Sequence, residues 1–343
     1  MWHTRCVRSG LPMNKVKFWL VAIFLGAVAI GDAQQPTKIP RIGFLSRDLH
    51  PADSRAPAPH NLEAFRQGLR ELGYIEGKNI FIEYRYADGR SERLPALTEE
   101  LVRLNVEAIV AESSNSAREA KKVTTTIPII MASGADPVAI GLVSSLARPG
   151  GNVTGLTNLT PALLGKRLEL LKEVVPKVSR FAVLDTVGSL AKPMFSEAEI
   201  AAHTLGAKLK LIEVNIPDPG FEGAFRIMAK ERIGGLITGS GTLSLSLYRK
   251  KILDLVKQRR TPAIYPSVVW TDAGGLMHYG ANIPDLYRRA ATYVDKILKG
   301  AKAAELPVEQ PKKFEFIINL NAAKQIGLTI PPNVLARADK VIK

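Results

Sequence analysis

The sequence predicts an α/β protein of two lobes, each a doubly wound parallel sheet, joined by a multi-segment hinge. Three observations support this prediction. Short apolar runs alternate with amphipathic stretches, which is typical of β-α-β units. The chain has 343 residues, and about 150 residues per domain is a usual expectation. The alternation stops at Pro149–Asn152 and then starts again.

The composition excludes several other classes of protein. Apolar residues make up 46% of the chain, which is too many for an intrinsically disordered protein. Cys6 is the only cysteine, so neither a disulfide scaffold nor a cysteine-based metal site is expected.

The first 33 residues are typical of a secretory signal peptide. Arg5, Arg8, Lys15 and Lys17 precede an uncharged run from Phe18 to Ile30, and small residues Gly31 and Ala33 follow. A membrane-spanning helix needs about 20 apolar residues, so an uncleaved anchor is the weaker alternative. Translation could also start at Met13.

Cleavage after Ala33 would leave a chain of 310 residues without cysteine, which suits an oxidising compartment such as the periplasm. Four basic residues and Asp32 would leave with the leader, which changes the net charge from +15 to +12. A basic surface could meet anionic membranes or polyanions, or it could simply be solvated.

The first half of the mature chain alternates strands and helices. Leu62, Phe65, Leu69 and Leu72 lie on one face of the first expected helix, which Gly73 ends. Expected strands are Ile42–Ser46, Asn79–Tyr86, Ala108–Ala111 and Ile127–Met131, and expected helices are Asn61–Leu72, Ser91–Leu104 and Ser113–Val123.

The second half repeats the alternation after a short extended link at Val153–Leu156. Its first helix has Leu164, Leu168, Leu171 and Val175 on one stripe. Expected strands are Phe181–Leu184, Lys208–Val214, Gly235–Thr238, Ala263–Tyr265 and Leu276–Gly280, and expected helices are Leu163–Val175, Glu197–Leu205, Phe221–Lys230 and Leu247–Arg259.

The last segment predicts further crossings between the lobes. A link at Ala281–Pro284 precedes a helix at Leu286–Leu298, and a strand at Phe314–Leu320 follows a proline-broken stretch. We expect a signal peptide at 1–33, a first lobe of 36–153 with 283–310, and a second lobe of 154–282 with 311–343. The lobe that carries the tail stays open.

Ligands of such sheets bind beyond the carboxyl ends of the strands, so polar residues there are candidate ligand contacts in the first lobe. Hydroxyls and free N–H groups at a helix start could bind an anion, or they could form an ordinary N-cap. Asp136 could accept from an ammonium group or cap a helix from Val138. The loop Arg47–His60, with His50 near its middle, could be a lid or a plain surface loop. The candidates are Ser46, Ser113, Ser114, Asn115, Ser133, Gly134 and Asp136.

The second lobe offers a similar set. Gly239 and Ser240 could bring backbone N–H groups to a ligand or form a tight turn. Aromatic rings near strand ends could face an apolar ligand group or pack under the loops. The candidates are Asp185, Thr186, Gly239, Ser240, Tyr265, Trp270 and Tyr279.

The motifs of common catalytic sites are missing. G-x-S-x-G, a complete P-loop and H-E-x-x-H do not occur, and the third glycine position of a dinucleotide motif at Gly239 holds Ser244. His50, His60, His203 and His278 lack metal-ligand spacing. We therefore expect no catalytic residues, no metal and no cofactor. No nucleic-acid recognition element precedes the first lobe.

Several stretches carry a family resemblance that covers nearly the whole mature chain. They are Ala135–Val143, Leu146–Gly155, Lys166–Lys172, Gly274–Gly280, Tyr287–Gly300, Leu306–Pro311 and Phe314–Asn321. The chain resembles the extracytoplasmic substrate-binding proteins of ABC transporters, tryptophan/tyrosine type. The resemblance implies a type I periplasmic-binding-protein fold with three crossovers.

We therefore expect a monomeric periplasmic protein that captures a small molecule by hinge closure and delivers it to an ABC permease of the inner membrane. The resemblance implies an amino acid as ligand, and the candidate site also allows other carboxylated solutes. Two alternatives stay open. A periplasmic ligand sensor could feed a membrane signalling receptor, which neighbouring genes would reveal. An exported enzyme could use the same scaffold, although a nucleophile-base pair is missing.

Overall fold

The computed structural model describes residues 39–50, 60–158, 161–187, 191–215, 220–239 and 248–343. The predicted signal peptide, residues 1–33, lies outside them. Two lobes with separate sheets make up the described chain from Pro40 onward. Each lobe is described by itself below.

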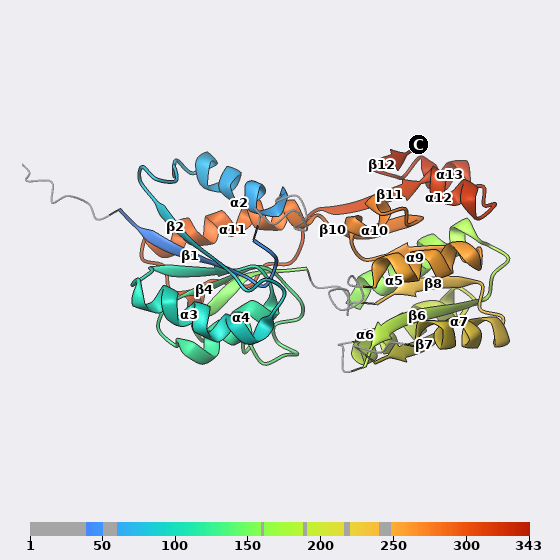
Figure 1. Cartoon of the computed structure of the whole chain (residues 1–343), viewed down its shortest axis with the longest axis horizontal. Coiled ribbons are helices and arrows are strands. Elements are labelled where there is room, and N and C mark those ends of the chain that lie inside the picture. The colour runs from blue at the N-terminus through green and yellow to red at the C-terminus, as the bar shows by residue number, and fades with distance from the viewer. Residues whose placement is uncertain (1–38, 51–59, 159–160, 188–190, 216–219, 240–247) are drawn as a thin grey trace, which may run out of the picture. The chain divides into compact units, whose positions relative to one another are not determined.

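Lobe 1 is a five-stranded parallel sheet with helices on both faces (Figure 1). The strand order is β2-β1-β3-β4-β5, with β1 at Arg41–Ser46, β2 at Phe81–Tyr86, β3 at Ala108–Ala111, β4 at Ile129–Gly134 and β5 at Val153–Thr157. Helices α2 (His60–Glu71) and α11 (Ile283–Leu298) cover one face, and α3 (Leu94–Arg103) and α4 (Ser114–Val123) cover the other.

Alternating side chains of the strands of lobe 1 explain why both faces are covered. Phe44 on β1 packs beneath α2 and α11, whereas its neighbour Leu45 packs beneath α3 and α4. Strands that are buried on both faces have continuous apolar runs in the sequence. For this reason they could be predicted from the sequence.

Lobe 2 has a seven-stranded sheet in the order β7-β6-β8-β9-β10-β11-β12. All neighbouring strands are parallel except β10 and β11, which are antiparallel. The strands are β6 (Arg180–Thr186), β7 (Lys208–Val214), β8 (Gly235–Thr238), β9 (Ala263–Tyr265), β10 (Met277–Ala281), β11 (Phe314–Asn319) and β12 (Lys340–Ile342).

The helices of lobe 2 also lie on two faces of its sheet. One core cluster lies beneath α5 (Pro161–Val174), α6 (Ala191–Thr204), α12 (Leu320–Gln325) and α13 (Pro332–Leu335). The other lies beneath α7 (Phe221–Lys230), α9 (Arg249–Gln258) and α10 (Val268–Asp272). Both lobes are therefore doubly wound, as the sequence predicted.

The two sheets share one winding pattern, because β2-β1-β3-β4-β5 corresponds to β7-β6-β8-β9-β10. In each sheet the chain first steps to one side and then reverses direction. The reversal leaves a topological switch point between β1 and β3 in lobe 1 and between β6 and β8 in lobe 2. Ligands of open α/β sheets bind at such points, beyond the carboxyl ends of the strands.

Two details differ from the sequence prediction, and one point that it left open is resolved. The expected link Val153–Leu156 is most of β5, which pairs with β4, so the boundary predicted after Val153 falls inside a strand of lobe 1. No helix starts at Val138, because residues 137–148 form turns. The tail, whose lobe was left open, adds β11 and β12 to the sheet of lobe 2.

The chain passes between the two sheets three times. The crossings lie between β5 and α5, between β10 and α11, and between Gln310 and β11. The second and third crossings are bonded to each other, since the Asn282 N–H donates to the Lys313 carbonyl at 3.0 Å.

Candidate ligand-binding site

The switch point of lobe 1 brings together the chain after β1 and the chain after β3. The two strands are in register from Ile42 and Ala108 to Leu45 and Ala111. The Ser46 hydroxyl, which is buried, accepts from the Asp48 N–H at 3.0 Å and turns the chain after β1. Glu112, the first residue after β3, donates its N–H to the Leu45 carbonyl at 3.1 Å. Asp48 and Glu112 therefore flank the switch point.

The predicted anion site at the start of α4 is occupied by a carboxylate of the chain itself. Ser113 caps α4, because its Oγ accepts from the Ser116 N–H at 3.3 Å. Both hydroxyls then donate to Glu112 Oε1, Ser113 at 3.1 Å and Ser116 at 3.2 Å. Asn115 is turned to neighbouring side chains, since it donates to Ser91 Oγ at 3.1 Å and accepts from Arg118 at 2.6 Å. These groups stabilise Glu112 and the helix start.

The end of β4 carries the next group of predicted residues. Ser114 and Ser133 are buried, and the Ser114 Oγ has no hydrogen-bond partner among the described residues. Asp136 Oδ1 accepts from the N–H groups of Val138 and Ala139 at 2.9 and 3.1 Å. That is the capping geometry, here in a turn rather than at a helix start.

Glu112 has an unusual electrostatic setting. It is only 8% exposed, and burial together with the nearby Asp48 raises the pKa of Glu112 to about 7. Surrounding protein atoms also raise the pKa of Asp48, although part of its side chain reaches solvent. Two carboxyl groups that disfavour each other's charge attract a cation.

Three aromatic side chains border these carboxyl groups. The Tyr287 hydroxyl, from α11, donates to the Glu112 carbonyl at 3.2 Å. Burial raises the pKa of Tyr86 to about 12, and the charge of Asp48 contributes. His50 lies edge-on to Tyr86, with ring centroids 5.1 Å apart. The rest of the predicted lid, residues 51–59, lies outside the described residues.

At the switch point of lobe 2, Asp185 and Thr186 end β6 and Gly239 follows β8. Asp185 is fully buried, and its Oδ1 accepts from the Thr186 N–H at 2.7 Å. A Cβ on Gly239 would lie 2.1 Å from Asp185 Oδ2, so only glycine fits beside this carboxylate. The structure thus brings three of the predicted residues together. Ser240 lies outside the described residues.

The predicted aromatic residues of lobe 2 are packed in its core. Tyr265 and Trp270 are both 0% exposed and stack at 4.7 Å with an interplanar angle of 7°. This is the geometry of the packing alternative. Tyr279 stacks on Phe314 with centroids 6.1 Å apart.

Arg167 on α5 is a buried cation that was not among the predicted site residues. It is 3% exposed, and its Nε donates to the Tyr279 carbonyl at 2.8 Å, two residues before the end of β10. None of the described residues forms an ion pair with it or accepts from its terminal nitrogens. Burial lowers the pKa of Arg167 to about 10. A buried guanidinium without an anionic partner is costly, and an anionic ligand group could supply one.

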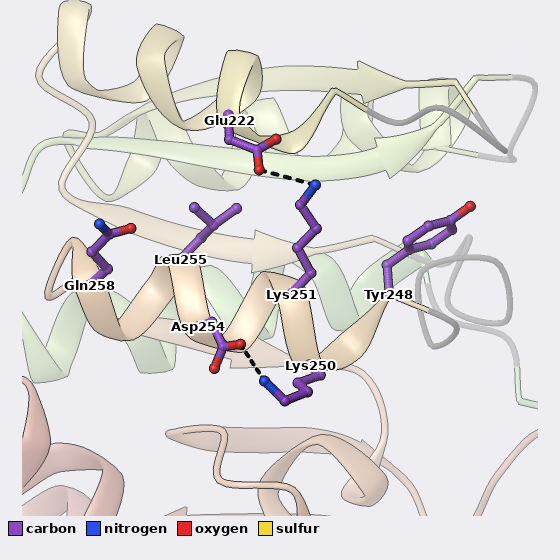
Figure 2. Close-up of a pocket in the computed structure, with 7 residues that line it drawn as sticks. All are labelled: Glu222, Tyr248, Lys250, Lys251, Asp254, Leu255 and Gln258. Carbon is purple, nitrogen blue, oxygen red and sulfur yellow. Dashed lines mark hydrogen bonds and ion pairs between the residues drawn. The ribbon is translucent and has the colours of Figure 1, made fainter.

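A cavity of about 430 Å³ lies elsewhere, between α7 and α9 (Figure 2). Its lining includes two ion pairs, Lys251 with Glu222 at 3.0 Å and Lys250 with Asp254 at 2.8 Å. These charges neutralise each other on an outer helical face. The cavity therefore does not have the character of a solute site.

Four residues at or beside the switch points were missed by sequence reasoning: Asp48, Tyr86, Glu112 and Tyr287. Glu112 had a usable signal, because it stands between a predicted strand and a predicted helix start. Tyr287 had none, since it is 175 positions from Glu112.

The described residues contain no group of three or more His, Cys, Asp or Glu side chains that could hold a metal ion. In the same residues, no helix is both long and apolar enough to cross a membrane.

Comparison with known proteins agrees with this architecture. A tyrosine-binding protein of Clostridioides difficile is 26% identical over 84% of this chain and 81% of its own length. The structure of an ABC domain in complex with L-Trp from Streptococcus pneumoniae has a TM-score of 0.76 at 24% identity, over 88% of this chain and 99% of that chain. A conserved domain protein of Vibrio cholerae has a TM-score of 0.76 at 28% identity, over 89% and 100% of the two chains.

The family model described as ABC transporter substrate binding protein matches residues 57–342. The match covers lobe 1 from α2 onward, nearly all of lobe 2 and all three crossings between them. The chain belongs to the family of ABC transporter substrate binding proteins.

Proposed function

We propose that the protein is a periplasmic receptor that captures an amino acid and delivers it to an ABC permease in the inner membrane. The family match over residues 57–342 is the observation that carries this proposal. The related tyrosine-binding protein and the L-Trp complex support an amino acid as the ligand class. An N-terminal signal peptide would direct the chain across the membrane.

The mechanism that we propose is capture between two switch points. Each lobe contributes the residues at the carboxyl ends of its strands, and the three crossings act as the hinge. Only a closed state lets one ligand contact the carboxyl ends of both sheets. The ligand therefore stabilises that state, because it makes more contacts there than in the open state. The reaction makes and breaks no bond, and a permease would recognise the closed form.

The buried charged groups of the two lobes suit the two charges of an amino acid. On lobe 2, Arg167 has one carbonyl partner and no described carboxylate, so it can bind the ligand's carboxylate. On lobe 1, the hydroxyls of Ser113 and Ser116 already donate to Glu112. They are thus committed to a carboxylate of the chain, which leaves the anion-binding role to lobe 2.

The test is a thermal-shift screen of the chain from Gln34 onward against the twenty amino acids, their decarboxylated amines and simple carboxylic acids. A ligand at 100 times its dissociation constant should stabilise the fold by about 2.7 kcal/mol. Calorimetry should then give one site per chain, and the ligand should be recovered unchanged. A complete screen without stabilisation, or turnover of a bound ligand, would contradict the proposal.

A further inference from the structure

Glu112 is folded back onto the strand beside it at the switch point of lobe 1. The Arg47 N–H, just beyond β1, donates to its Oε1 at 3.2 Å, and the hydroxyls of Ser113 and Ser116 donate to the same oxygen. Three donors therefore hold one carboxylate oxygen in place. The other oxygen, Oε2, has no hydrogen-bond partner among the described residues.

The charge of this carboxylate is also unmatched. No described lysine, arginine or histidine forms an ion pair with Glu112, and Arg47 contacts it through the backbone only. Its neighbour Asp48 carries the same sign of charge and is exposed. A largely buried carboxylate without a cationic partner is unfavourable unless a cation arrives, and its Oε2 is not bonded to any described residue.

A second, independent feature marks the same edge. The Ser114 hydroxyl is more than nine-tenths buried and has no described partner. Its Oγ faces the end of β4, only 2.7 Å from the point where a Cβ on Gly134 would lie. An unsatisfied buried hydroxyl at the same carboxyl end of the sheet as Glu112 indicates that a polar group from outside completes the site.

Aromatic side chains lie near Glu112 and Asp48, which we call the acidic edge of lobe 1. Tyr287 is bonded to the Glu112 backbone, and Tyr86, at the end of β2, stacks near Tyr84 with centroids 6.4 Å apart. Carboxylates together with aromatic faces favour an ammonium group, because both supply negative potential.

We propose that Glu112 and Asp48 form the subsite for the ammonium group of the ligand, with Ser114 and Tyr86 beside it. This inference rests on the proposed function and adds the polarity of binding: the ammonium group is bound by lobe 1. An ammonium group would donate to Glu112 Oε2 and to Asp48, and it would supply the positive charge that this edge lacks.

The subsite makes ligand binding depend on pH. The titratable and charged groups that face Glu112 are Arg47 and Asp48 after β1 and Tyr287 on α11, and Tyr86 on β2 faces Asp48 and Tyr287. Because the pKa of Glu112 lies at about 7, the free protein must release a proton from it to bind an ammonium group. Affinity should therefore rise as the pH increases from 6 to 8.

The experiment compares three ligand sets by calorimetry: L-tyrosine and L-tryptophan, their deaminated acids 3-(4-hydroxyphenyl)propionate and 3-indolepropionate, and the amines tyramine and tryptamine. Glu112→Gln keeps an oxygen acceptor for the three donors but removes the charge. We expect it to weaken amino-acid binding at least tenfold, which is the loss of one charge-assisted hydrogen bond. Binding of the deaminated acids should not weaken, and the pH dependence should disappear.

Glu119→Gln is the matched control, since Glu119 lies on α4 and pairs with Arg118 and Lys122. It should bind all ligands as the unmodified chain does. Asp48→Asn, at an exposed position, repeats the test without a folding risk and should also weaken amino-acid binding.

Three outcomes would overturn the inference. If Glu112→Gln and Asp48→Asn bind the amino acid as tightly as the unmodified chain, the ammonium group lies elsewhere and only the proposed function stands. If the unmodified chain prefers the deaminated acids, the polarity is wrong. If no member of the full screen binds, both proposals fall.

Discussion

The hydroxyl of Tyr287 donates to the carbonyl of Glu112 at 3.2 Å across 175 positions of sequence. Tyr287 belongs to α11, which the chain reaches directly from β10 of lobe 2, whereas Glu112 directly follows β3 of lobe 1. This bond attaches the backbone of Glu112 to α11, the helix that follows the second crossing between the lobes. The helix therefore connects the position of Glu112 to the hinge.

Tyr287→Phe should lower the free energy of unfolding by about 1 kcal/mol, because it removes one buried hydrogen bond without changing the shape of the ring. Tyr293→Phe on the same helix removes the bond from Tyr293 to the Pro307 carbonyl at 2.7 Å and should cost about the same. Urea unfolding measures both. Only Tyr287→Phe should also weaken ligand binding, and equal affinities of the two variants would contradict this role.

The stability of the ligand-free protein should depend on the protonation of Glu112. Its pKa of about 7 lies above the ordinary value of 4.5, so between these values the folded state binds more protons than the unfolded state. The contribution of Glu112 to the free energy of unfolding should therefore fall as the pH rises from 4.5 to 7 and level off above 7. The full effect is at most about 3 kcal/mol.

Urea titrations from pH 5 to 8 of the unmodified chain and of Glu112→Gln measure this contribution as the difference between the two proteins. That difference should shrink as the pH rises to 7, whereas the difference for Glu119→Gln should not depend on pH. A pH-independent difference for Glu112→Gln would show that Glu112 does not titrate in this range.

The positions of strands and helices followed from the sequence because most strands are buried on both faces. Val110 and Ile130, for example, pack in one core of lobe 1 while Ile109 and Ile129 pack in the other. β5 was taken for a link because it carries Thr154, Gly155 and Thr157 instead of a continuous apolar run. Its partner β4 is the preceding strand, but the turns between them carry no helix pattern that would indicate a β-α-β unit.

The candidate site was predictable only where a strand end and a helix start are adjacent. Ser113 stands at such a point, and the structure places it beside the switch point. The hydroxyl of Ser113, however, donates to Glu112, and Glu112 is held by the backbone of Arg47, 65 positions away. Burial and charge at this edge are tertiary properties, so the acidic character of lobe 1 could not be derived from the sequence.

His278 should act in the opposite direction to Glu112. Burial lowers the pKa of His278 to about 4, and the charge of Arg167 contributes. The folded state therefore binds fewer protons than the unfolded state between about 4 and 6.5. The contribution of His278 to the free energy of unfolding should fall as the pH decreases through that window, by at most about 3 kcal/mol.

His278→Gln keeps a donor for the Tyr265 carbonyl, which the His278 Nδ1 contacts at 3.1 Å. Compared with the unmodified chain, the variant should gain relative stability as the pH falls from 7 to 4 in urea unfolding. A difference between the two proteins that does not depend on pH would exclude this role of His278.

Arg167→Met should leave the ligand-free protein as stable as before or stabilise it, because an apolar side chain of similar length replaces a buried charge without an anionic partner. It should weaken binding of amino acids and leave tyramine binding unchanged. Lys166→Met is the control, since the neighbouring Lys166 pairs with Glu169 at 2.6 Å on α5. Calorimetry with the three ligand sets separates the two variants, and equal losses for amino acid and amine would exclude a carboxylate contact.

Gly239→Ala should disrupt the switch point of lobe 2. The new Cβ would lie 2.1 Å from Asp185 Oδ2 and 2.9 Å from Asp185 Cβ, so the buried carboxylate must move. We expect a loss of about 2 kcal/mol, typical of overpacking a buried site. Gly223→Ala on α7 has no atom within 4 Å of its new Cβ and should stabilise the protein by about 0.5–1 kcal/mol, since alanine favours the helix. Urea unfolding of the two variants should therefore give changes of opposite sign, and a neutral Gly239→Ala would mean that Asp185 is free to leave the position it occupies beside β8.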